Sequence, residues 1–158
     1  MPRFALIALL ASACSPPAPE ANRAEAPAAQ APQAAPAPPI LPADATAVED
    51  VASIKGEWRV AGVSGQPLSQ PFGISASIGG GRVRFVSQCI ARQYDLHVDG
   101  GLVTARPVGN DVPDCLRPLT IDERGLEQAM SQAKMAYRLP SNALVFDGPA
   151  GAVTLFTQ

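Results

Sequence analysis

One stretch of the sequence constrains the fold more than any other: residues 82–89, which read R-V-R-F-V-S-Q-C. Along it, Val83, Phe85, Ser87 and Cys89 share one face at a period of two. The intervening side chains are mostly polar, and this alternation is typical of a β-strand with one buried face. We therefore predict a core strand that ends on a thiol able to form a covalent link.

Cys115 is the other cysteine in the part of the chain that has the composition of a folded domain. Cys89 and Cys115 are far apart in the sequence, without the C-x-x-C spacing that lowers the pKa of a thiol in redox-active pairs. A redox-active pair remains the alternative, but we predict a structural disulfide between Cys89 and Cys115.

The first 14 residues, M-P-R-F-A-L-I-A-L-L-A-S-A-C, have the pattern of a secretory signal. A positive charge at Arg3 precedes an apolar run at 4–10, which is too short to span a bilayer. Small residues then lead to Cys14, and this order resembles the lipobox of bacterial lipoproteins, in which that thiol is acylated. We predict lipidation of Cys14, and Ser15 resembles the signal for sorting to the outer membrane. An ordinary cleaved signal with an incidental cysteine is the alternative.

Residues 15–50 form a predicted linker. Between Ser15 and Asp44, 20 of 30 residues are Ala or Pro, and large apolar side chains are almost absent. Such a segment cannot offset its conformational entropy by burial, so we expect a disordered tether that holds a domain away from a membrane surface.

Charge divides the chain in the same way. Residues 15–50 carry five acidic groups and one arginine, whereas residues 51–158 carry ten basic and nine acidic groups. The basic residues are scattered in the sequence without interleaved aromatic residues, so the composition argues against a nucleic-acid partner.

Residues 51–158 are long enough for one small core and contain turn signals at short intervals. The apolar alternations between those turns predict a meander rather than parallel βαβ units. Asp99-Gly100-Gly101 predicts a tight hairpin, because glycine accepts the positive φ that such turns need. The predicted strands cover residues 56–63, 74–78, 82–89, 94–99, 102–105, 136–139, 143–146 and 153–156.

A single helix is predicted after Pro118, because the apolar period changes there from two to a helical spacing. Thr120 and Glu123 fit a capping box, whereas Gly125 weakens the helix. We assign Asp122 and Glu123 a capping role and expect the methionines at 130 and 135 to fill the core. The predicted fold is mainly β (α+β): a small antiparallel β-barrel-like meander with one α-helix.

Four groups of motifs occur in a fixed order: G-E-W-R-V with G-Q-P-L; R-V-R-F-V-S-Q-C with Y-D-L-H-V-D-G-G-L-V-T; the second cysteine and the helix; and L-V-F-D-G-P-A-G-A-V-T-L-F. Together, over about residues 53–156, they resemble the META domain of HslJ-like bacterial envelope proteins. The family usually has Asn after the first cysteine and T-x-M-A-C at the second, where this chain has Ile90 and V-P-D-C. The resemblance implies no cofactor, no enzymatic activity and a role in envelope stress or antibiotic tolerance. The predicted signal and the lipid anchor at Cys14 place the chain in the bacterial cell envelope, where we expect the domain to face the periplasm.

Two alternatives remain open at this point. Gly56-Glu57-Trp58 is similar to the G-x-W of lipocalin-type barrels, which carry small apolar ligands. A hydrolase would need an activated nucleophile, and the sequence shows none near a plausible oxyanion hole. His97, the single histidine, falls on the face of its strand opposite Leu96 and beside Asp95 and Asp99. We expect that face to be solvated, so we assign no catalytic residue and no metal site.

Overall fold

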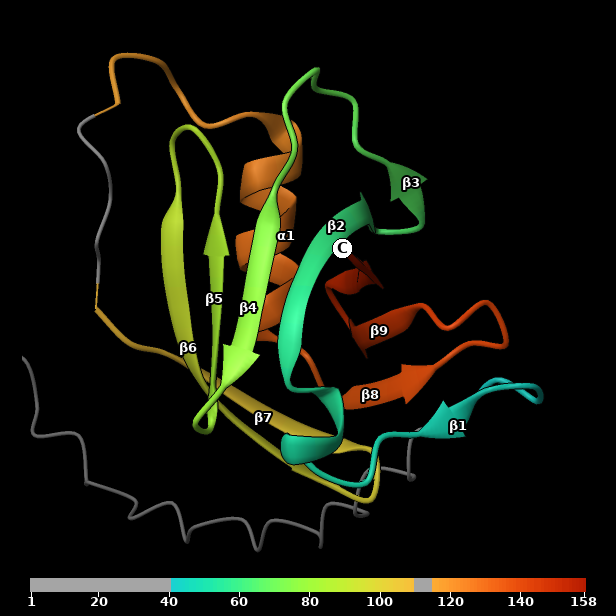
Figure 1. Cartoon of the computed structure of the whole chain (residues 1–158). Coiled ribbons are helices and arrows are strands. Elements are labelled where there is room, and N and C mark those ends of the chain that lie inside the picture. The colour runs from blue at the N-terminus through green and yellow to red at the C-terminus, as the bar shows by residue number, and fades with distance from the viewer. Residues whose placement is uncertain (1–40, 110–114) are drawn as a thin grey trace, which may run out of the picture. The chain divides into compact units, whose positions relative to one another are not determined.

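Eight antiparallel strands close into a barrel in the part of the chain that this computed structural model describes, residues 41–109 and 115–158 (Figure 1). Their hydrogen-bonded order is β8-β7-β6-β5-β4-β2-β10-β9, and pairing of β8 with β9 closes the ring. Two short strands lie outside the ring, where β1 pairs with β8 and β3 pairs with β2. The elements are β1 (Thr46–Ala47), the 3-10 turn η1 (Ala52–Ile54), β2 (Gly56–Val63), β3 (Gln66–Pro67), β4 (Ser75–Gly79), β5 (Arg82–Val86), β6 (Ala91–Asp99), β7 (Leu102–Pro107), α1 (Ile121–Ser131), β8 (Met135–Arg138), β9 (Leu144–Gly148) and β10 (Gly151–Thr157).

This architecture confirms the predicted fold class, a mainly β, barrel-like meander with one helix among the described residues. The predicted hairpin at Gly100-Gly101 is also present, and both glycines have positive φ, 53° and 88°. Within the described ranges, α1 is the one α-helix, and no helix has the length and apolar character needed to cross a membrane.

Strand β5 has the predicted facing but is shorter than predicted. Val83 and Phe85 are fully buried, as their alternation indicates. The strand ends at Val86, because the backbone amide of Ser87 bonds back to the carbonyl of Ile90 and closes a turn. Cys89 is buried, but it lies in this turn and not in the strand.

The helix α1 begins at the predicted capping box. Thr120 is the N-cap, its hydroxyl accepts from the amide of Glu123, and the Glu123 carboxylate accepts from the amide of Thr120. Its apolar face, which includes Leu126 and Met130, is buried with the barrel interior in one cluster. Gly125 allows α1 to lie close to β2, because a Cβ at this position would be only 3.1 Å from Cγ1 of Val63.

The ordered domain begins before the predicted boundary at residue 51, which is a correction to the predicted linker at 15–50. Residues 41–50 are described: β1 pairs with β8, and Val48 is buried. The physical reason lies on the outer face of the barrel, where Tyr137 and Val145 are covered by Leu41 and Ala45. The rest of the predicted linker and the predicted signal lie outside the described residues.

Gly148 provides a test of how the helix end is packed against β9. A Cβ at this position would lie 2.2 Å from the backbone oxygen of Gln132, so the chain after α1 would have to move. We expect Gly148→Ala to lower the free energy of unfolding by about 2 kcal/mol or more. The matched control is Gly79→Ala, where the nearest atom is a side-chain carbon at 3.9 Å. Equal effects of both variants in urea unfolding would contradict this account.

Candidate functional site

The carboxylate of Glu123 is the most enclosed charged group among the described residues, with no exposed surface. It accepts four hydrogen bonds. Arg117 donates two through Nη1 and Nη2, at 2.9 and 3.0 Å, Ser87 Oγ donates one at 2.5 Å, and the amide of Thr120 donates one at 2.8 Å. We call these four residues the Glu123 cluster. All four acceptor positions of the carboxylate are therefore occupied.

Two opposing effects set the protonation of Glu123. Burial alone would raise the pKa of this carboxyl group, because it penalises the charged form. Hydrogen bonds from Arg117, Ser87 and Thr120, together with the charge of Arg117, outweigh burial and lower the pKa from 4.5 to about 2. The hydrogen bond to Glu123 in turn raises the pKa of Arg117. This acid is therefore held as an anion near neutral pH, with Arg117 as its counter-ion.

The predicted disulfide between Cys89 and Cys115 is present, with Cα atoms 5.4 Å apart. Its position explains how the Glu123 cluster is assembled. Ser87 lies two residues before Cys89, and Arg117 lies two residues after Cys115. The bond therefore fixes together the two segments that donate to Glu123 from outside its helix.

The neighbouring acid, Asp122, lies in the first turn of α1 and also binds a loop outside the helix. Asp122 accepts from the amide and the hydroxyl of Ser69, at 2.8 and 2.7 Å, and so holds the loop between β3 and β4. In the same loop, Gln70 accepts from the hydroxyl of Thr120, and the ring of Phe72 lies 4.9 Å from the guanidinium carbon of Arg117. Asp122 thus fixes a loop to the helix start in addition to lying in the first helical turn.

A second polar group lies beside α1. Arg92 forms an ion pair with Glu127 of the helix, and the Tyr94 hydroxyl donates to the Glu127 backbone carbonyl at 3.5 Å. Burial first, and the charge of Glu127 second, raise the pKa of Tyr94 to about 12, although Arg92 opposes this. The phenol therefore stays protonated and acts as a hydrogen-bond donor.

His97 lies where the sequence predicts, exposed on the outer face of β6 opposite Thr104 of β7. Asp95, on the same face, forms an ion pair with Arg82 at 3.0 Å, so a cation already occupies its carboxylate. In residues 41–109 and 115–158, no group of three or more His, Cys, Asp or Glu side chains is placed to hold a metal ion. Cys14, the predicted lipidation site, lies outside the described residues.

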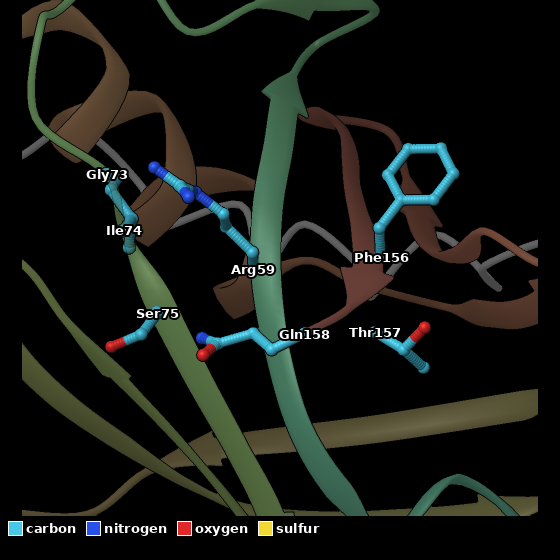
Figure 2. Close-up of a pocket in the computed structure, with 7 residues that line it drawn as sticks. All are labelled: Arg59, Gly73, Ile74, Ser75, Phe156, Thr157 and Gln158. Carbon is cyan, nitrogen blue, oxygen red and sulfur yellow. The ribbon is translucent and has the colours of Figure 1, made fainter.

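A hollow of about 450 Å³ lies on the outer surface over β2. Figure 2 shows Arg59 rising from β2 with its guanidinium directed toward Gly73, and the ring of Phe156 on the other side of Arg59. The remaining lining residues come from the beginning of β4 and the end of β10. They are Ile74, Ser75, Thr157 and Gln158. We call this the Arg59 hollow.

The sequence predicts two parts of these arrangements, the capping pair of Thr120 with Glu123 and the disulfide of Cys89 with Cys115. It does not indicate that the two pairs meet in one cluster. The spacing of Arg117, six residues before Glu123 at the third position of the helix, is the sequence feature that could have indicated the ion pair. The Arg59 hollow had no such signal, because its walls come from strands far apart in the sequence.

The chain was also compared with known proteins. No protein-family model, no curated protein and no solved structure matches it. The geometry of the described residues and the sequence motifs therefore carry the functional argument.

Removal of the disulfide should destabilise the domain substantially. For a sequence separation of 26, chain entropy predicts a loss of roughly 3 to 4 kcal/mol in the free energy of unfolding. We expect Cys89→Ser and the double Cys89→Ser, Cys115→Ser variant to lose the same amount, measured by urea unfolding. A full thiol count in unfolded, unreduced wild-type protein would show that the bond does not form.

The low pKa of Glu123 predicts that the folded domain loses stability as the pH falls. Its folded pKa of about 2 lies below its ordinary value of 4.5, so its stabilisation is complete above about pH 5. That stabilisation is lost as the pH falls from about 5 to about 2. We expect the stability difference between wild type and Glu123→Gln to shrink over this range in urea unfolding. Parallel pH profiles of the two proteins would be inconsistent with a charged, paired Glu123.

Proposed function

We propose that this chain is a non-catalytic, membrane-anchored envelope lipoprotein with a META-type domain, which contributes to envelope stress or antibiotic tolerance. One observation supports the non-catalytic part: Glu123, the most deeply buried acid of the described residues, is saturated by partners from its own chain. A catalytic acid or base needs a proton position available to a substrate. Glu123 has none, because Arg117, Ser87 and Thr120 occupy its oxygens.

The envelope location rests on the pattern of residues 1–14 and on the disulfide. Disulfides persist in oxidising compartments such as the bacterial periplasm, and a bond between Cys89 and Cys115 suits such a location. Acylation of Cys14 would attach the chain to a membrane, with the outer membrane as the proposed site. The linker would then present the domain to the periplasm.

Carriage of a small apolar ligand inside the barrel, as in a lipocalin, is the alternative. The interior argues against it, because large side chains occupy the space that such a ligand would need. Trp58, from the Gly56-Glu57-Trp58 motif, is almost fully buried and donates through Nε1 to the carbonyl of Ile54 at 3.0 Å. Other fully buried side chains of the same interior cluster include Phe85, Phe146, Leu144 and Leu155.

The proposal is tested by complementation of a deletion strain under heat or an envelope-active antibiotic. We expect His97→Ala and Glu57→Gln to complement as well as wild type, because neither side chain carries a reaction. Cys14→Ser should complement poorly and fail to fractionate with membranes, and the wild-type mature N-terminus should carry acyl mass.

Two results would oppose the proposal. Mature, unmodified wild-type protein in the soluble periplasm would refute the anchor. Loss of complementation by His97→Ala at an unchanged melting temperature would reveal a chemical role on β6. For the carrier alternative, mass spectrometry of a lipid extract from purified protein should find no stoichiometric apolar ligand.

A further inference from the structure

The Arg59 hollow combines an arginine without an acidic partner and an exposed aromatic ring. Strand register brings them together: Arg59 of β2 lies directly opposite Phe156 of β10 on one side and Ser75 of β4 on the other. These three side chains form one row across the outer surface of the barrel (Figure 2). Phe156 is 40% exposed, so its apolar side chain is accessible beside the guanidinium of Arg59.

No carboxylate of the described residues lies within ion-pair distance of Arg59. Glu57, two residues away on the same strand face, instead accepts from the hydroxyl of Ser77 at 2.7 Å. The guanidinium of Arg59 therefore has no acidic partner among the described residues. Arginine in this state presents a planar set of donors that matches the geometry of an oxyanion.

Gly73 leaves room for the guanidinium of Arg59 to lie close to the backbone at one wall of the hollow. A Cβ at this position would lie 3.0 Å from Nη2 of Arg59 and 3.3 Å from its Nε. Any larger residue would push the guanidinium away from this wall, so the absence of a side chain allows it to lie against the backbone. Because the guanidinium ends a flexible side chain, a methyl group at this position would displace it by a few tenths of an ångström.

The other polar groups of the hollow are also suited to an anion. Gln158 uses its side-chain amide to donate to the carbonyl of Trp58 at 3.1 Å, which leaves the second N–H of the amide for a ligand. Ser75 supplies a hydroxyl whose bond to the Val86 carbonyl is long, 3.4 Å. Arg59, Gln158 and Ser75 thus each bring a side-chain donor to the hollow, and the apolar ring of Phe156 flanks it.

We propose that the Arg59 hollow binds an oxyanion, a carboxylate or a phosphate, whose organic part lies against Phe156. The site lies on the outer wall of the barrel, so it is distinct from an interior cavity of the lipocalin kind. The proposed site does not depend on the lipid anchor. It would give the domain, which we propose to be non-catalytic, a ligand-binding activity. The same chemistry could come from a soluble molecule or from a phospholipid headgroup.

The test is an NMR titration of the full chain at neutral pH, followed through the backbone amides of Gly73 and Phe156. The probes are hexanoate and hexyl phosphate, with hexanol and inorganic phosphate as controls that each lack one half of the proposed ligand. We expect the two amphiphilic anions to shift both amides and to bind more tightly than either control. Equal binding of hexanol, or no local shift with any anion, would overturn the proposal.

Variants separate a specific site from general attraction to positive charge. We expect Arg59→Gln to weaken binding about tenfold, as loss of a charged hydrogen-bond partner should. Gly73→Ala should also weaken binding at an unchanged net charge, because it displaces the guanidinium. The matched control is Arg84→Gln, which removes an exposed arginine of β5 and should leave binding unchanged. A loss in Arg84→Gln as large as in Arg59→Gln would overturn the proposal.

Vesicles identify the source of the anion. Arg59-dependent sedimentation with phosphatidylcholine vesicles that contain phosphatidylglycerol, but not with pure phosphatidylcholine, would assign the site to phospholipid headgroups. Binding of the soluble anions without vesicle binding would assign it to a free molecule. Thermal melting of each variant checks that the fold is intact, so a folding defect is not mistaken for a lost site.

Discussion

The ion pair between Glu123 and Arg117 is the interaction on which one end of the barrel depends. A buried carboxylate is costly unless every acceptor position is filled, and here a helix cap, a turn and a loop each supply donors. The disulfide lowers the entropy that those segments would otherwise lose on coming together. The covalent bond and the ion pair therefore support each other, because each holds the segments in the geometry that the other requires.

Alternation along the strands made most of the barrel predictable. Val83 and Phe85 in β5, and Tyr94 and Leu96 in β6, are buried as their period of two indicates. Alternation reports which way a side chain faces, however, and not whether its backbone is paired. Cys89 keeps the facing of β5 although the backbone has already turned, which is why the predicted strand ran three residues too far.

Features that depend on tertiary pairing were not predictable. Strand β1 has two residues in an alanine- and proline-rich context, and it becomes a strand because the outer face of β8 needs a cover. The sequence indicates a helix cap at Thr120 and Glu123, but the other donors of the Glu123 cluster come from segments that only the fold brings near. The Arg59 hollow similarly exists because β2 lies between β4 and β10.

That position of β10 also determines how the chain must fold. The last strand of the sequence lies between β2 and β9, so the ring cannot close until residues 151–157 are available. Pairing of β2 with β10 spans nearly the whole domain, and contacts so distant in sequence form slowly. A chain stalled or clipped before residue 151 would expose the edges of β2 and β9 together. Unpaired edges of this kind are templates for association with other chains, so the C-terminal strand protects the domain from aggregation.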